Sequence, residues 1–400
     1  MTNQIFIRNM NERRVLTLLR KEGSLSRAEI ARRLALTRSG VTYLVDALLA
    51  QNLVNEAEAI SSSVPSHDLG RPGVALRLNP TGHYFLGAEI GVGVVRLALV
   101  DMALEPVRTE AIDLPQSPDP QTAVQLIKTF LAGCESDKRY KGRIRAIGVT
   151  VPGLVRSDGF VLHLPILGWR NVNFLALAEK SFKIPVSIEN NANAAAFGEV
   201  YCNPKRSHDL ILFLKLGNGC GGAAIINGQL LRGTSGVATE FGHMRVSDHG
   251  PTCHCGQTGC LETHVNHAAL SRYLNEAGAT IGSDPADVAE ALAEGDQAVK
   301  AAVQRLENHL STGMVNLSNI FNPSDIVLGG SLRPILALCL ENLRAAVARG
   351  IVPGVQPPNI NLSRISRYEC AVGAAAITHH AQFDTTALSL AGASQKAART

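Results

Sequence analysis

The feature that most constrains this chain is a ten-residue stretch, residues 253–262, which reads CHCGQTGCLE. Three cysteines spaced C-x-C-x4-C suit a chain that folds tightly around one small ion, because zinc takes four thiolate or imidazole ligands in a tetrahedron. Gly256 and Gly259 supply the sharp turns that let neighbouring thiolates converge. The sequence therefore predicts a structural zinc site. Its predicted thiolate ligands are Cys253, Cys255 and Cys260.

A fourth ligand is needed, and the spacing alone leaves it open. The candidates are four histidines close by in the sequence: His243, His249, His254 and His264. A redox dithiol and a set of unrelated buried thiols are the alternatives, but C-x-C differs from the C-x-x-C redox spacing. The other five cysteines are predicted to be small core residues. They are Cys134, Cys202, Cys220, Cys339 and Cys370.

The chain has 400 residues, a length that predicts two or three domains. Its charge is distributed unevenly along the sequence. Residues 1–80 contain 11 Lys/Arg and 7 Asp/Glu, so this fifth of the chain carries the entire net charge of +4. Such asymmetry indicates a nucleic-acid-binding module attached to a neutral one. We find no secretory signal and no apolar run of membrane-spanning length. With cysteine usage that fits a reducing compartment, a cytoplasmic protein without membrane association is expected.

Residues 1–80 are predicted to form a winged helix-turn-helix. A helix over 10–22 comes first. The capping box of Ser26 and Glu29 begins a short second helix, and Thr37 caps a third. Two strands, at 53–57 and 74–78, would form the wing. Short polar groups and cations on the outer face suit base edges and phosphates. The predicted DNA contacts are Arg27, Arg38, Ser39, Thr42, Tyr43 and Arg71. The alternative is a helical dimerisation module with a solvated basic face.

From residue 84 onward, strands alternate with helices, which predicts an α/β fold. Two similar cycles, each beginning with a strand-turn-strand unit, start near residues 84 and 210. This repetition indicates a duplicated domain with a cleft between its halves. Long helices are expected over about 285–320 and a strand over 325–330, and the tail over 382–400 is predicted to be flexible.

Several motifs in residues 84–377 resemble those of the ROK family, which comprises sugar kinases and sugar-responsive repressors. They are Pro152-Gly153, ENNANAA at 189–195, the glycine-rich 217–222, EFGH at 240–243, the cysteine stretch, and 319–330. The N-terminal helix-turn-helix and the Gly-Arg-Pro at 70–72 resemble the repressor branch.

The resemblance implies a hexokinase/actin-like (RNase H-like) fold with two lobes. The first lobe would span 81–190 plus 371–381, and the second 191–370. In the family, the histidine of E-x-G-H completes the zinc site, which here makes His243 the fourth ligand, with its other ring nitrogen turned toward a sugar. The implied sugar-binding residues are Gly153, Asn190, Asn191, Glu240, His243 and Glu262.

Two departures from the kinase pattern argue against catalysis, so no catalytic residue is predicted. Kinases of this family have an aspartate base at the position of Asn191, and an amide cannot accept a proton near neutral pH. Their D-x-G-G-T phosphate loop reads E-I-G-V-G here, at 89–93. A third departure, Ile166 where many members have asparagine, puts in question which hydroxyls are read. Trp169 could lie beside the ligand or pack in the core.

These observations predict a cytoplasmic, sugar-responsive transcriptional regulator, a repressor of carbohydrate-utilisation genes. Its expected partners are double-stranded operator DNA, a free sugar and further copies of itself, as a homodimer or homotetramer. Two rivals are an active sugar kinase with an appended DNA-binding domain and a regulator controlled by a protein partner.

Overall fold

The computed structural model describes residues 2–57, 74–115, 117–156, 158–203, 209–365 and 367–383. The predicted loop of the wing, with Arg71, and the predicted flexible tail beyond residue 383 lie outside the described residues. No helix within the described part is both long enough and apolar enough to cross a membrane.

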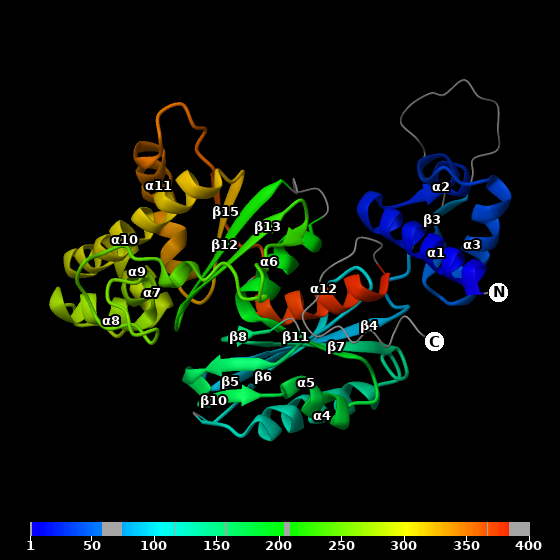
Figure 1. Ribbon diagram of the computed structural model, residues 1–400, viewed down its shortest axis with the longest axis horizontal. Helices are drawn as coiled ribbons and strands as arrows, with labels where there is room; N and C mark the ends of the chain where they lie inside the picture. Colours follow the sequence, from blue (N-terminus) through cyan, green and yellow to red (C-terminus); the bar gives the residue numbers. More distant parts are fainter. Residues whose placement is uncertain are drawn as a thin grey trace.

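The N-terminal unit is the predicted winged helix-turn-helix (Figure 1). It comprises α1 (Thr2–Glu22), β1 (Leu25–Ser26), α2 (Arg27–Leu34), α3 (Arg38–Ala50), β2 (Val54–Ala57) and β3 (Ala75–Leu78). The capping box is present: Ser26 accepts from the Glu29 amide, and the Glu29 side chain accepts from the Ser26 amide. Helix α1 begins eight residues before the predicted start, on a segment with exposed apolar side chains that lacks the amphipathic pattern.

Two five-stranded sheets follow, built to one plan. The first has the order β11-β7-β4-β5-β6 and the second β14-β13-β12-β15-β16. In each, an antiparallel three-strand meander is extended by two parallel strands. The strands of the first sheet are β4 (Tyr84–Ile90), β5 (Val94–Val100), β6 (Pro106–Asp113), β7 (Ile144–Val151) and β11 (Val186–Asn190). Those of the second are β12 (Leu210–Leu216), β13 (Cys220–Ile226), β14 (Gln229–Leu230), β15 (Asp325–Gly329) and β16 (Asn359–Leu362). The predicted duplication is confirmed.

Further elements cover each sheet. The first lobe adds α4 (Pro120–Glu135), α5 (Phe174–Ser181) and a small sheet of β8 (Leu154–Val155), β9 (Val161–Leu164) and β10 (Trp169–Val172). The second adds α7 (Glu262–Val265), α8 (His267–Glu276), α9 (Pro285–Glu294), α10 (Gln297–Phe321) and α11 (Arg333–Gly350). The predicted long helical region divides into α9 and α10 because Gly295 takes a left-handed φ of 89° and Asp296 caps α10.

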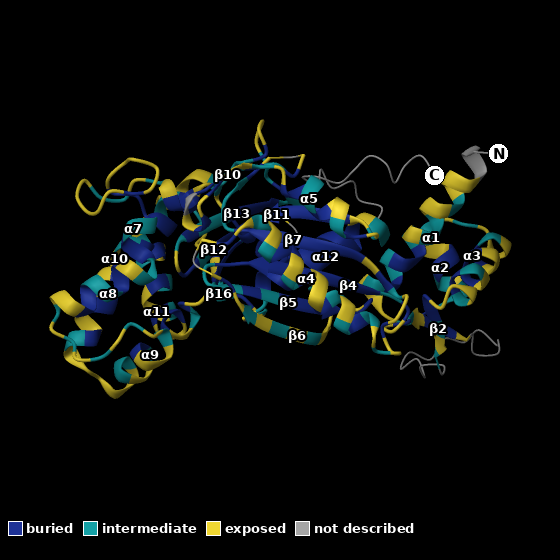
Figure 2. Cartoon of the chain, turned by 90° about the horizontal axis from the view of Figure 1, so that it is seen from below, coloured by how far each residue is buried: buried dark blue, intermediate teal, exposed yellow. Residues whose placement is uncertain are grey.

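Two helices lie between the sheets, α6 (Asn191–Tyr201) and α12 (Glu369–Phe383). Helix α12 packs on β4 and β7, α6 packs on β12 and β13, and the two helices pack on each other (Figure 1). They cross at Gly198 and Gly373, where a Cβ on Gly198 would lie 2.8 Å from the Gly373 Cα. This buried centre, dark blue in Figure 2, forms one apolar cluster with the core of the winged helix-turn-helix.

Candidate functional site

The outer face of α3 is free of the core. Val41, Leu44, Val45 and Leu48 are buried on its inner face. Thr37 caps the helix by accepting from the Gly40 amide at 3.1 Å. The predicted DNA-contact residues on the outer face, all exposed, are Arg38, Ser39, Thr42 and Tyr43. This is the arrangement in which a recognition helix presents its N-terminal residues to the major groove.

Arg27 of α2 is another predicted DNA contact. Arg27 lies beside two exposed carboxylates, Asp46 and Glu56, each at 3.3 Å, and its role as a DNA contact stays a prediction. Arg8, which the sequence analysis missed, donates to the Tyr43 hydroxyl at 3.1 Å and adds a cation next to the α3 face. No local pattern marks Arg8, because the contact spans 35 residues of sequence.

The cysteine stretch and His243 form a cluster that can hold a metal ion. Four donor atoms, one each from His243, Cys253, Cys255 and Cys260, lie within 4.8 Å of one another. The Cys255 and Cys260 sulfurs are 3.6 Å apart, and the Cys253 sulfur is 3.4 Å from His243 Nδ1. A tetrahedral zinc ion would hold its ligand atoms about 3.5–3.8 Å apart, so these separations fit it. Both glycines of the stretch have positive φ, as the turns require.

His243 also faces the neighbouring carboxylates. Its Nδ1 is turned toward the Cys253 sulfur, while its Nε2 lies 3.9 Å from the Glu240 carboxylate. Glu262 accepts from the Cys220 amide at 3.0 Å, and its other oxygen lies 3.9 Å from the Cys253 sulfur. The cluster thus holds two predicted sugar-binding carboxylates next to one imidazole.

A shallow hollow opens beside this group, between the two lobes. Three predicted sugar-binding residues line it, namely Gly153, Asn190 and Glu240. The rest of its lining is Leu154, Val155, Asn193, Gly222, Gly236, Val237 and Ala238. Asn190 donates to the Gly153 carbonyl at 3.0 Å, and its side-chain oxygen caps α6. The structure therefore places Gly153 and Asn190 on the first-lobe wall of the hollow and Glu240 on the second-lobe wall.

Asn191 lies deeper, next to a group of buried charges. Its Nδ2 donates to the Glu89 carboxylate at 3.3 Å, and the same carboxylate lies 3.5 Å from Arg96 and 3.6 Å from Lys215. Close by, burial raises the pKa of the Glu369 carboxyl to about 7, against the opposing effect of Lys215.

Trp169 belongs to the core and not to the hollow. Its indole donates to the Pro118 carbonyl at 2.6 Å and stacks on Phe174 at 5.5 Å between ring centroids. Ile166 is 37% exposed and does not line the hollow either.

Comparison with known proteins gives the family. The model of the ROK family matches residues 85–381, and that of winged helix-turn-helix DNA-binding domains matches residues 8–55. The chain belongs to the ROK family.

Relatives of this ROK protein include repressors and kinases. It is 29% identical to the xylose repressor of Bacillus spizizenii over 88% of this chain and 90% of that protein. A crystal structure of a ROK family transcriptional regulator, a homologue of the E. coli MLC protein, superposes with a TM-score of 0.78 at 25% identity, covering 94% and 97% of the two chains. A ROK family glucokinase from Streptomyces griseus, in complex with glucose and AMPPNP, gives 0.64 at 28% identity, covering 74% and 98%.

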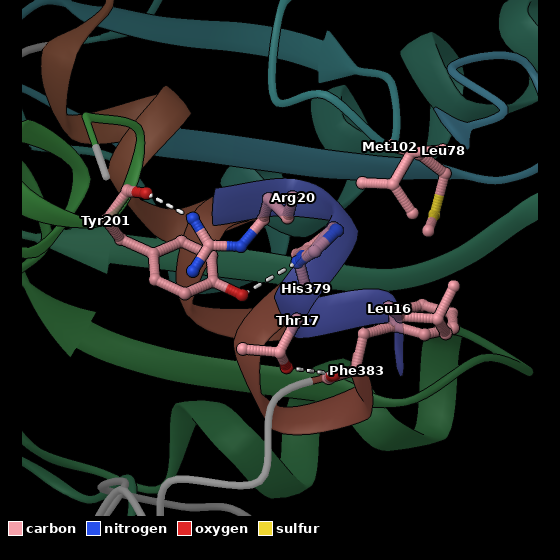
Figure 3. Close-up of a pocket in the computed structure, with 8 residues that line it drawn as sticks. All are labelled: Leu16, Thr17, Arg20, Leu78, Met102, Tyr201, His379 and Phe383. Atoms are coloured by element: carbon pink, nitrogen blue, oxygen red, sulfur yellow. Dashed lines mark hydrogen bonds between the residues drawn. The ribbon is translucent and has the colours of Figure 1, made fainter. Parts of the chain in front are cut away.

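The ROK domain contacts the winged helix-turn-helix at the far end of α6. Arg20 of α1 donates to the carbonyl of Tyr201, the last residue of α6, at 2.7 Å, and stacks over its ring at 3.8 Å from the centroid. The Tyr201 hydroxyl lies 3.1 Å from His379 Nδ1 on α12, and Thr17 donates to the Phe383 carbonyl (Figure 3). Helix α6 therefore begins at the hollow and ends at the DNA-binding domain.

Proposed function

We propose that this ROK protein is a transcriptional repressor whose affinity for operator DNA is set by a free sugar bound between its lobes. The observation that carries the proposal is the placement of α6. Asn190 at its N-terminus lines the hollow, and Tyr201 at its C-terminus contacts Arg20 of the DNA-binding domain. Eleven residues of helix extend about 16 Å. One rigid element therefore joins the effector site to the DNA-binding domain.

The lining of the hollow supports a sugar as effector. Polar side chains of the kind that bind sugar hydroxyls line it, Asn190 and Asn193 on one side and Glu240 on the other. A few directed polar groups between two lobes suit a small neutral ligand. Relatives of this chain include xylose repressors, and the related glucokinase structure contains glucose, which supports an aldose.

We expect this repressor to lack kinase activity. At the position of the family's catalytic aspartate stands Asn191, which can bind a hydroxyl but cannot take its proton. Glu89, the acidic residue of the first phosphate loop, is held by Arg96, Lys215 and Asn191. A carboxylate engaged by two cations is poorly suited to hold a metal–phosphate complex.

We further propose that the His/Cys cluster holds one structural zinc ion. Three thiolates and one imidazole form a closed ligand set of the kind that zinc prefers in structural sites. Such an ion would fix the segment that carries His243 and Glu262. The chain's own residues would then present the His243 imidazole and the carboxylates to the sugar.

The sugar acts by binding one arrangement of the two lobes more tightly than the other. This difference in sugar affinity sets the largest change in operator affinity that the sugar can cause. We propose that the repressor binds a palindromic operator as a homodimer, because a two-fold protein matches two half-sites in the major groove.

A panel of free pentoses and hexoses, read by thermal shift, tests this function. A sugar at 100 times its Kd should stabilise the protein by about 2.7 kcal/mol. A coupled ADP assay is run beside it. Stabilisation by one sugar without ADP release is expected. No shift with any sugar would favour control by a protein partner, and sugar-dependent ADP release at ordinary kinase rates would favour the kinase.

A further inference from the structure

A buried ion pair joins the two lobes beside the hollow. Arg232 follows β14 in the second lobe, and Glu189 lies in β11 of the first sheet. Arg232 Nη2 donates to Glu189 Oε2 at 2.6 Å, and the two side chains are only 9% and 4% exposed. A charge-assisted bond this short and this well shielded from water is among the strong ones.

Glu189 also holds the first wall of the hollow. Its second oxygen, Oε1, accepts from the Asn190 amide at 2.9 Å and from the Asn193 side chain at 3.0 Å. Both asparagines line the hollow, and Asn190 caps α6. The Glu189 carboxylate is thus the common anchor of the polar groups that the first lobe offers.

Arg232 holds the opposite wall through its backbone. Its carbonyl accepts from the Ala238 amide at 3.0 Å, which closes the loop over residues 232–238. Gly236, Val237 and Ala238 of this loop line the hollow, and Glu240 follows. One residue therefore contacts the loop of its own lobe through the main chain and the anchor of the other lobe through the side chain.

We infer that Arg232 is a positioning residue for the sugar, an inference that rests on the proposed function. Hydrogen-bonding groups on two separate lobes bind one ligand well only when their separation is held to within about 0.5 Å. At the hollow this separation is held by the Arg232–Glu189 pair. The Lys215–Glu89 pair also joins the lobes, next to Asn191. Arg232 Nη1 is buried and has no partner among the described residues, so one donor of this guanidinium stays available at the junction.

The test uses four variants of the full-length protein and the sugar selected by the thermal-shift panel. Arg232→Gln removes the pair and leaves the Glu189 charge buried alone, which destabilises the fold. The double variant Arg232→Gln/Glu189→Gln removes both charges and should regain thermal stability. Arg232→Lys keeps a cation that can reach Glu189. Arg139→Gln, which breaks an exposed pair with Asp137, is the control.

Calorimetric titration should show sugar affinity reduced about ten-fold or more in Arg232→Gln and in the double variant, the equivalent of one lost hydrogen bond. Arg232→Lys should recover part of the sugar affinity, and the control should match wild type. A double variant that is stable and binds sugar like wild type would overturn the inference, because the pair would then serve the fold alone. If wild type itself binds no sugar, the proposed function fails first.

Discussion

Arg20 offers the sharpest perturbation of the contact between the two functional units. Its guanidinium donates to the Tyr201 carbonyl at 2.7 Å and lies 3.8 Å from the centre of the Tyr201 ring. A hydrogen bond from a charged donor contributes about 1.5–3 kcal/mol, and a cation–π contact about 0.5–2 kcal/mol. Arg20→Met removes both interactions and keeps an aliphatic side chain in the pocket that Arg20 lines together with Leu16 and Phe383.

The coupling between sugar and DNA can be at most the part of this energy that differs between the two lobe arrangements. Couplings of this kind are typically about 1–3 kcal/mol. We therefore expect Arg20→Met to reduce the ratio of operator affinities with and without sugar by about five-fold, the equivalent of about 1 kcal/mol. Sugar affinity should change little, because the hollow is at the other end of α6.

Fluorescence anisotropy with labelled operator, with and without saturating sugar, measures that ratio. Lys21→Met removes an exposed cation from the next position of α1 and is the matched control. A variant that folds, binds operator and retains the full wild-type ratio would refute the role of this contact, and coupling would then have to pass through other elements.

Three further outcomes are expected. Asn191→Asp should not create a kinase, and it should lower the melting temperature. The new carboxylate would lie about 3.3 Å from that of Glu89, and the repulsion between the two charges is about 5 kcal/mol at an effective dielectric of 20, before nearby cations are counted. Sugar-dependent ADP release by this variant would contradict our interpretation of the phosphate loop. Glu369 has a folded pKa of about 7, above the usual value near 4.5, so ionising this carboxyl destabilises the folded protein. The free energy of unfolding should therefore fall by about 3 kcal/mol as pH rises from 4.5 to above 7. Urea melts of Glu369→Gln should lack this decline, and an equal decline in the variant would mean that other groups cause it. Metal analysis should find about one zinc per wild-type chain and much less in Cys255→Ser, whereas full zinc in the variant would exclude this cysteine as a ligand.

Local patterns predicted the parts of the fold that neighbouring residues decide. The Ser26 capping box, the Thr37 cap and the strand-turn-strand unit of β4 and β5 all formed as expected, because each depends on contacts within a few residues or on continuous apolar runs. Strand β6 was missed because it lies at a sheet edge with both faces largely solvated, so its apolar pattern is weak.

The candidate site was predicted only where a motif marks it. The cysteine stretch and Asn190 stand out in the sequence, and the structure brings the cysteines to His243 and places Asn190 at the hollow. Arg232 and Tyr201 carry no local signal, since the first meets Glu189 from 43 residues away and the second meets Arg20 from 181. Contacts of that range depend on how the lobes pack, which periodicity and spacing do not encode.

The central claim is that sugar and operator DNA bind to the same molecule and change each other's affinity. The direct test is a thermodynamic cycle, with sugar affinity measured by calorimetry on the free protein and on its complex with operator, and operator affinity measured with and without sugar. We predict a change of about five-fold or more, and the same factor in both directions, because linkage requires it. Equal sugar affinity for free and DNA-bound protein would contradict the account.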